Sequence, residues 1–223
     1  MGDVHGHFEL LRQLLSKVRF APLHDRLFST GDLVDRGPFS EQALEWLAYP
    51  WLHAVRGNHE QMAIDCAAGV GDPARHARNG GEWFHRLAPA EQQRIAAALA
   101  TLPLAIEIQR TCGEPIGVIH ADLPESPPTP DWGRAMTLLQ ASDPQIRRKA
   151  QTQALYARNR ITSMDTRPVN GVDRLYVGHS TVPQVLRLGN VIYIDTGCSF
   201  SDGALTLIEL GREQITTCRL SDL

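Results

Sequence analysis

Apolar residues recur along the chain with two different spacings, which predict an alternation of helices and strands. Phe8, Leu11, Leu14 and Leu15 follow the spacing of one helix face, so residues 7–18 are predicted to be helical. Other stretches are short apolar runs bounded by turn-forming residues, a pattern typical of strands. The predicted helices cover residues 7–18, 39–47, 60–68, 89–102 and 145–156. The predicted strands cover residues 26–30, 52–56, 104–108, 116–119, 175–177, 184–188, 191–195 and 205–210.

The segments between these elements have the composition of turns and loops. A turn at residues 111–114 is predicted to join one strand pair, and Gly189-Asn190 is predicted to join another as a hairpin. Residues 124–130 form a proline-rich loop that is too short for a linker between domains. The 223 residues contain no internal repeat, so they are expected to form one domain.

Three short fragments place polar side chains beside glycines, which let a backbone turn sharply where side chains must converge. They are residues 2–6 (GDVHG), 31–37 (GDLVDRG) and 57–60 (GNHE). The second and third follow predicted strands, and ligands bind at the carboxyl edge of strands in open α/β sheets. His120 and His179 also follow apolar, strand-like runs. These fragments and histidines are therefore predicted to form one site.

The donors in these fragments are oxygens and imidazoles without a thiolate, which is the chemistry of a two-metal hydrolytic centre. Asp3 and His5 alternate around Val4, so an extended segment places both on one face, about 7 Å apart at their Cα atoms. Asp32 has two carboxylate oxygens and can bridge two ions about 3.5–4 Å apart, which could hold one hydroxide between them. Asn58 adds a neutral oxygen.

Composition limits the class of protein further. The net charge of −3 and the pI of about 6.3 favour neither nucleic acid nor an anionic membrane as a partner. An anionic substrate is compatible with this charge, because bound divalent ions reverse the local field of an acidic site. The four cysteines are far apart and form no C-x-x-C pair, and no apolar run reaches the length of a membrane helix. We expect a cytoplasmic protein in a reduced compartment.

Five motifs, GDVHG, GDLVDRG, GNHE, IHAD and VGHS, follow one another in this order. Together they resemble the phosphoprotein phosphatase branch of the metallophosphoesterases, and within it the small bacterial and lambda-type protein phosphatases. Further matches at residues 54–62, 79–81 and 193–197 extend the resemblance over nearly the whole chain. The resemblance implies an α/β, calcineurin-like metallophosphoesterase fold, with a two-sheet β-sandwich flanked by helices.

The same resemblance implies which residues hold two divalent metal ions. The expected metal is manganese, with iron or zinc as alternatives. The first ion would take Asp3, His5 and Asp32, and the second would take Asp32, Asn58, His120 and His179.

The resemblance also implies the catalytic side chains. His59 is the expected general acid at the leaving oxygen, oriented by Asp35. Arg36 is expected to bind phosphoryl oxygens, a task that suits its planar fork. A second arginine is expected later in the chain, and Arg158 is preferred to Arg160.

The predicted reaction is hydrolysis of a phosphate monoester by in-line attack of a metal-held hydroxide. The predicted substrate is phosphoserine or phosphothreonine in a protein or peptide, with phosphotyrosine as a further substrate. One alternative is a dinucleoside polyphosphate or cyclic nucleotide hydrolase. Asp35 disfavours a dinucleoside polyphosphate hydrolase, because the dinucleoside tetraphosphatases carry a different residue before the corresponding arginine. Another is a non-catalytic metal-binding interaction module, which His59, Asp35 and Arg36 disfavour, because a scaffold needs no general acid. The oligomeric state is left open.

The chain departs from the family pattern in two places. Only Met1 precedes the first fragment, where relatives carry an apolar strand. The preferred explanation is that the sequence starts late; the alternative is a frayed terminus with a weakened first metal site. Ala157 stands where related phosphatases tend to carry asparagine, so Arg160 and Arg56 compete with Arg158.

The remaining candidate residues are given plainer roles. His7, His24, His53, His76 and His85 are assigned to the surface or to packing, with a supporting role near the first fragment open to His7. Trp83 is expected in the core or a groove wall, and Cys66 as a small buried residue on a helix.

Overall fold

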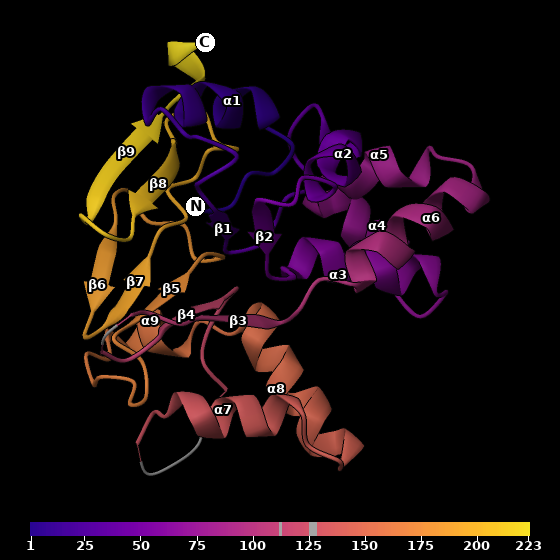
Figure 1. The fold of residues 1–223 in the computed structure, drawn as a ribbon. Helices are drawn as coiled ribbons and strands as arrows, with labels where there is room; N and C mark the ends of the chain where they lie inside the picture. Colours follow the sequence, from indigo (N-terminus) through magenta and orange to yellow (C-terminus); the bar gives the residue numbers. More distant parts are fainter. Residues whose placement is uncertain (112, 125–128) are drawn as a thin grey trace.

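A five-stranded mixed sheet forms one layer of the computed structural model, which describes residues 1–111, 113–124 and 129–223 (Figure 1). Its central strands are parallel, and the two edge strands pair antiparallel with their neighbours. Its strands, in spatial order, are β3 (Ala105–Ile108), β4 (Ile116–Ile119), β5 (Arg174–Val177), β7 (Val191–Tyr193) and β6 (Leu186–Leu188).

The second layer consists of two strand pairs joined by the N-terminal residues. β1 (Leu27–Ser29) and β2 (Leu52–Ala54) are parallel, and β8 (Leu205–Glu209) and β9 (Gln214–Cys218) are antiparallel. Between the pairs, Thr30 N donates to Met1 O at 3.0 Å, and Gly2 N donates to Thr206 O at 3.0 Å. The backbone hydrogen bonds therefore run across the layer from β2 to β9.

The N-terminal residues are firmly held in this layer. The amino group of Met1 donates to Phe28 O at 2.8 Å, and the side chain of Met1 is buried. Asp3 and His5 are each only 2% exposed. In this structure the first fragment is therefore not frayed, although no regular strand precedes it.

Helices cover the outer faces of the two layers (Figure 1). The helix α1 (Phe8–Lys17) lies on β8 and β9, and α7 with α8 lies on the five-stranded sheet. The helices α2 to α6 pack around β1 and β2, and α9 packs through Ile161 against the five-stranded sheet. The bounds of the helices after α1 are α2 (Ala43–Leu47), α3 (Asn58–Ala67), α4 (Pro73–His76), α5 (Glu82–His85), α6 (Pro89–Ala100), α7 (Trp132–Leu139), α8 (Pro144–Tyr156) and α9 (Asn159–Ser163).

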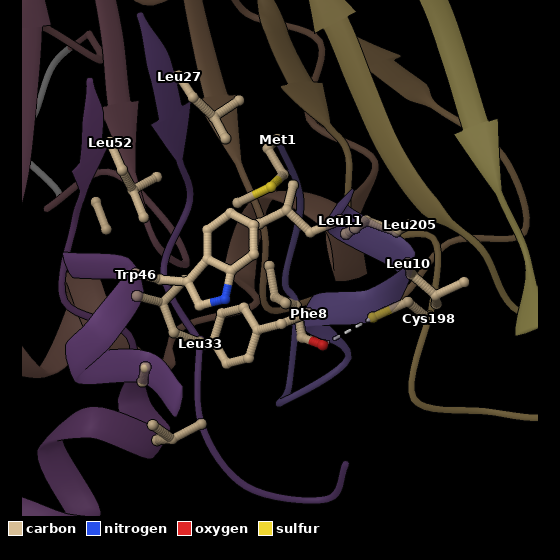
Figure 2. Packing of buried hydrophobic residues seen from close by; sticks show 14 of the residues in the cluster. Met1, Phe8, Leu10, Leu11, Leu27, Leu33, Trp46, Leu52, Cys198 and Leu205 are labelled. Atoms are coloured by element: carbon tan, nitrogen blue, oxygen red, sulfur yellow. Dashed lines mark hydrogen bonds between the residues drawn. The ribbon is translucent and has the colours of Figure 1, made fainter. Parts of the chain in front are cut away.

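The core explains why α1 forms where the apolar spacing predicts it. Phe8, Leu10, Leu11 and Leu14 are fully buried, and Phe8 stacks on Trp46 with ring centroids 5.3 Å apart (Figure 2). Burial of each such side chain contributes about 1.5–3 kcal/mol of transfer free energy. A separate cluster, which includes Tyr176, Ile192 and Ile208, packs between the two layers. The predicted two-sheet α/β sandwich with flanking helices is confirmed.

The predicted elements are present with shifted ends, and several others were missed. The predicted helix at 39–47 starts as a 3-10 turn at Ser40–Gln42, and the strand predicted at 184–188 begins at Leu186. The missed α-helices and strand are α4, α5, α7, α9 and β9, and two short turns of helix at Ala77–Gly81 and Leu220–Asp222 were also missed. Residue 112 of the predicted turn and residues 125–128 of the predicted loop lie outside the described residues. Within the described residues, no helix is both long and apolar enough to cross a membrane.

Candidate active site

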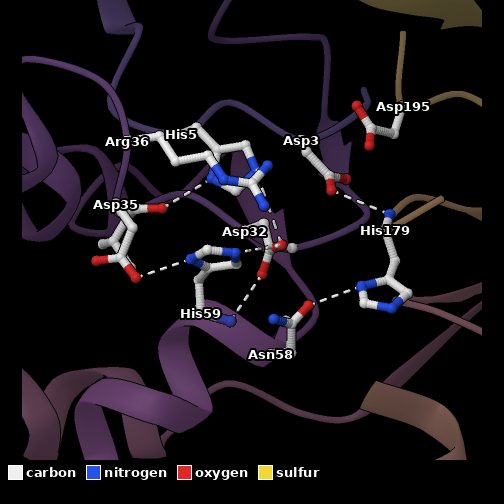
Figure 3. Close-up of polar contacts among 12 residues, drawn as sticks. Asp3, His5, Asp32, Asp35, Arg36, Asn58, His59, His179 and Asp195 are labelled. Carbon is white, nitrogen blue, oxygen red and sulfur yellow. Dashed lines mark hydrogen bonds and ion pairs between the residues drawn. The ribbon is translucent and has the colours of Figure 1, made fainter. Parts of the chain in front are cut away.

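The ends of four strands bring the predicted motifs together (Figure 3). Residues 31–37 follow β1, and residues 57–60 form the start of α3, shortly after β2. His120 comes directly after β4, and His179 comes shortly after β5. Because these strands belong to both layers, the site lies where the two layers meet, at the carboxyl ends of their parallel strands.

Glu60 ties the second fragment to the third. Its Oε2 accepts hydrogen bonds from Asp32 N at 2.9 Å and Gly57 N at 2.7 Å, and its Oε1 accepts from Leu33 N at 2.7 Å. The Glu60 side chain is fully buried, so these bonds replace the water that its carboxylate loses. Gly57 must be a glycine, because a Cβ there would collide with the Asp32 side chain. This role of Glu60 is not predicted from the sequence.

The backbone of the second fragment is strained where the site needs it. Asp32, Asp35 and Arg36 have φ angles of 51°, 70° and 66°, in the left-handed region that non-glycine residues rarely adopt. Each such residue costs on the order of 1–2 kcal/mol. The hydrogen bonds that the backbone N–H groups of this loop donate to Glu60 help to hold the strained conformation.

Two groups of side chains that could hold a metal ion share Asp32. The first combines Asp32 with His5 and His59, and the second combines it with His120 and His179; within each group the ligand atoms lie within 4.8 Å of one another. This sharing agrees with the predicted bridging role of Asp32. The structure differs from the prediction in placing His59, rather than Asp3, within the first group.

Asp3 lies beside these groups and is held by its neighbours. Its Oδ1 accepts from Thr30 Oγ1 at 3.0 Å, and its Oδ2 accepts from the backbone N of His179 at 3.0 Å. Burial and the charge of Asp195 raise the pKa of Asp3 well above its usual value. Burial and the charge of Asp3 do the same to the pKa of Asp32. A bound cation would relieve this crowding of carboxylates.

The second group has the orientation expected around a cation. His120 Nδ1 donates to Thr30 O at 2.7 Å, which leaves a lone pair on Nε2, 2.9 Å from Asn58 Oδ1. His179 Nδ1 lies 2.7 Å from the same oxygen, and its Nε2 lies 3.3 Å from Tyr156 O. Burial lowers the pKa of His120 well below its usual value and that of His179 to about 3, so both rings are neutral. Neutral imidazoles and an amide oxygen suit a divalent ion.

The general-acid candidate is paired with the residue predicted to orient it. His59 Nδ1 donates to Asp35 Oδ2 at 2.8 Å, which leaves Nε2 facing Asp32 at 3.8 Å. Burial opposes the charge of Asp35, but hydrogen bonds from His59 and His76 outweigh burial and hold its pKa at about 2. Asp35 is therefore ionised at neutral pH and fixes the orientation of the His59 ring. Burial lowers the pKa of His59 itself, and a bound phosphoryl dianion would raise it again.

Two residues that support Asp35 were missed in the sequence. His76 Nε2 donates to Asp35 Oδ2 at 3.0 Å, and Trp83 Nε1 donates to Asp35 Oδ1 at 2.7 Å. His76 is fully buried and bonded, so its assignment to the surface or to packing was incomplete. The signal was the fragment Asn79-Gly80-Gly81. Gly80 O accepts from Arg36 N at 3.2 Å, and a Cβ on Gly81 would collide with the ring of His76.

The arginines divide into two that face the site and two that serve other contacts. Arg36 Nη1 donates to His5 Nε2 at 3.0 Å, and Arg158 Nη2 donates to His179 O at 3.2 Å. Arg160 is buried, and its Nη1 donates to two loop carbonyls, those of residues 165 and 167, at 2.8 Å each. Arg56 is bonded to Gln61 and to carbonyls at the end of α6. These contacts favour Arg158 over both competitors as the second phosphate-binding arginine.

The two arginine assignments predict opposite effects of substitution. Arg158→Ala is expected to lower kcat/KM by about 10- to 100-fold, because a charged hydrogen bond to substrate is worth about 1.5–3 kcal/mol. Arg160→Ala is expected to lower the free energy of unfolding by about 2 kcal/mol, because the buried guanidinium and its two hydrogen bonds to the loop carbonyls are lost. Steady-state kinetics and urea denaturation of both variants test this. A larger loss of kcat/KM in a folded Arg160→Ala protein would reverse the assignment.

Comparison with known proteins agrees with this geometry. Residues 1–183 match the family model described as calcineurin-like phosphoesterase. The chain is 38% identical over 215 residues to serine/threonine-protein phosphatase 1 of Salmonella typhimurium, covering 94% of this chain and 90% of that protein. It is 33% identical over 216 residues to serine/threonine-protein phosphatase 2 of Escherichia coli, covering 94% and 91%.

Other similar proteins align with a smaller part of the chain, or are similar to it in fold at low sequence identity. A symmetrical bis(5'-nucleosyl)-tetraphosphatase of Methylococcus capsulatus is 33% identical over 145 residues, which is 64% of this chain and 47% of that protein. The solved structure of a protein serine/threonine phosphatase from Saccharomyces cerevisiae superimposes with a TM-score of 0.59 at 18% identity, covering 98% and 78%. The family match and the two relatives that align over almost their whole length agree with the site. The chain belongs to the calcineurin-like phosphoesterase family.

Proposed function

We propose that this phosphoester hydrolase is a metal-dependent serine/threonine protein phosphatase. The observation that carries the proposal is the sharing of Asp32 by two donor groups, with the Asp35–His59 pair beside them. A dinuclear centre next to a carboxylate-oriented imidazole suits hydrolysis of a phosphate monoester, whose leaving alkoxide needs a proton. The two relatives that align with this chain over almost their whole length are named serine/threonine-protein phosphatases, which supports a protein substrate.

The metal-binding residues are proposed to hold two divalent ions, with manganese as the expected metal. Bound ions of this kind supply Lewis acidity and an activated water for attack on phosphorus. The mixed carboxylate, amide and imidazole set, without a thiolate, suits manganese. The proposed ligands are Asp3, His5, Asp32, Asn58, His120 and His179.

The remaining site residues are proposed to bind the phosphoryl group and to deliver a proton. His59 gives a proton from Nε2 to the leaving oxygen, while Asp35 stabilises the charged ring. Arg36 and Arg158 bind phosphoryl oxygens, Arg36 from its place next to His5 and Arg158 from its place next to His179. We further propose one metallophosphoesterase domain over residues 1–223 and a cytoplasmic location.

Activity on a substrate panel tests the proposal. The protein is incubated with Mn²⁺ and either a phosphoserine or phosphothreonine peptide, an aryl phosphate, diadenosine tetraphosphate or a cyclic nucleotide. We expect the highest kcat/KM with phosphopeptides and complete loss of turnover after chelation. Faster hydrolysis of the tetraphosphate would replace a protein substrate with a nucleotide. Absence of metal-dependent turnover on every substrate would support the non-catalytic alternative.

A further inference from the structure

A cysteine and two histidines lie close together outside the proposed dinuclear centre, and one of the histidines contacts Asp35. Cys66 lies near the end of α3, His76 ends α4 and His85 ends α5. These three short helices lie together in Figure 1, on the side of the molecule away from the five-stranded sheet. Taking one donor atom from each residue, the atoms lie within 4.8 Å of one another.

The imidazoles in this cluster have buried nitrogens without a protein partner. His76 Nδ1 and His85 Nε2 are both shielded from solvent, and neither has a hydrogen-bond partner within the described part of the chain. A buried polar atom without a partner costs free energy, so it points to a ligand. The two rings meet edge to face with centroids 5.0 Å apart, and no hydrogen bond joins His76 Nδ1 to His85 Nε2.

His76 has the orientation of a metal-ligating histidine. Its Nε2 donates to the carboxylate of Asp35 at 3.0 Å, so the lone pair is on Nδ1. Metal-bound histidines nearly always donate their other nitrogen to such a carboxylate or carbonyl, which fixes the tautomer and makes the free nitrogen more basic. Gly81 lies against the ring, and a Cβ at this position would collide with it.

We propose that Cys66, His76 and His85 form a separate site for one zinc ion, with solvent as its fourth ligand. A thiolate with two imidazoles favours zinc over manganese, whereas the dinuclear centre offers no thiolate. Zinc bonds of about 2.0–2.3 Å require the donors to close by about 1 Å. Cys66 and His85 are only partly buried, so their side chains have room for this movement.

The zinc site and the proposed catalytic site have one residue in common. His76 would bind zinc and also donates a hydrogen bond to Asp35, which orients the proposed general acid His59. Zinc binding here does not depend on whether the chain dephosphorylates proteins.

Protonation of the ligands predicts how zinc binding responds to pH. Burial lowers the pKa of His85, so the ring is neutral and ready to bind. Burial, with Asp65 and Asp72, raises the pKa of the Cys66 thiol, so zinc must displace its proton. Zinc affinity is therefore expected to rise with pH.

Cobalt, which replaces zinc and absorbs light, distinguishes this site from the dinuclear centre. Titration of Co²⁺ into the manganese-loaded protein is expected to give a thiolate-to-cobalt band in the near ultraviolet with one equivalent. Cys66→Ser should abolish the band, His85→Gln should weaken cobalt binding at least about 10-fold, and Cys218→Ser should leave it intact. Cys218 is the matched control, since its thiol bonds to Gln13. Absence of a band in the unmodified protein, or a band that survives Cys66→Ser, would overturn the proposal.

A second measurement avoids the risk that Cys66→Ser fails to fold. In the unmodified, manganese-loaded protein, zinc is expected to slow alkylation of Cys66 by iodoacetamide at least about 10-fold, as read by peptide mass spectrometry. Labelling of Cys218 should not change. A band lost in Cys198→Ser but kept in Cys66→Ser would instead assign the thiolate to the dinuclear centre, because Cys198 Sγ contacts the backbone of Asp3. Equal labelling of Cys66 with and without zinc would also contradict the site.

Discussion

Asp32→Asn is expected to lower kcat by about 10³-fold, which corresponds to about 4 kcal/mol of transition-state stabilisation. The reason is that Asp32 belongs to both donor groups, so its loss weakens two metal sites at once. An amide cannot bridge two cations as a carboxylate does. Metal content by mass spectrometry should fall from two manganese ions per chain to one or fewer, in parallel with kcat.

The control for this variant is Asp222→Asn, which removes one carboxylate at the surface. Asp222 is exposed and pairs with Lys17 at 3.0 Å, and such pairs contribute little to stability. Its metal content and kcat should match those of the unmodified protein. An Asp32→Asn protein that keeps two ions and full turnover would show that Asp32 does not bridge.

His59→Asn is expected to lower kcat on a phosphoserine peptide by about 10²- to 10⁴-fold while both metal ions remain bound. The reason is that the serine alkoxide leaves poorly without a proton, and the Asp35-oriented ring is the proposed donor. An aryl phosphate whose phenolate leaves easily should lose much less. The measurement is therefore the ratio of the two losses, which a general effect on folding or metal binding would not produce.

The comparison variant for His59 is His24→Asn, since His24 is exposed and has no part in the site. It should hydrolyse both substrates at the original rates. Equal losses on the peptide and the aryl ester in His59→Asn, with full metal content, would assign His59 to binding rather than to proton transfer. Loss of metal would make it a ligand, as its place beside His5 and Asp32 allows.

Local patterns were sufficient to predict those parts of the fold and site that depend on neighbouring residues. The apolar spacing of α1 reports its buried face directly, and the glycines mark loops where the chain turns sharply. β9 escaped prediction because its central residues are partly exposed and lack an apolar alternation; Ile215 is 51% exposed. The short helices α4 and α5 fall below the length at which apolar periodicity is visible.

The supporting contacts of the site could not be predicted, because they join residues that are distant in sequence. His76 and Trp83 reach Asp35 across 41 and 48 positions. Glu60 is adjacent to the proposed acid, yet its bonds go to Asp32 and Leu33 in another loop. In the sequence alone, each of these residues is equally consistent with an ordinary position at the surface or in the core. Only the folded arrangement shows which carboxylate each one contacts.

The bond between Gly2 and Thr206 has a consequence for the order of events during synthesis. A ribosome makes the N-terminal end of the chain first, and domains tend to fold as units while they emerge. Asp3 and His5 cannot be fixed between β1 and β8 until the residues near 206 have been made. The Asp3 carboxylate accepts a hydrogen bond from the backbone N of His179, so this contact also forms only after His179 has been made. The proposed ligands that are translated first are therefore among the last to reach their final positions, and contacts of such long sequence separation slow folding.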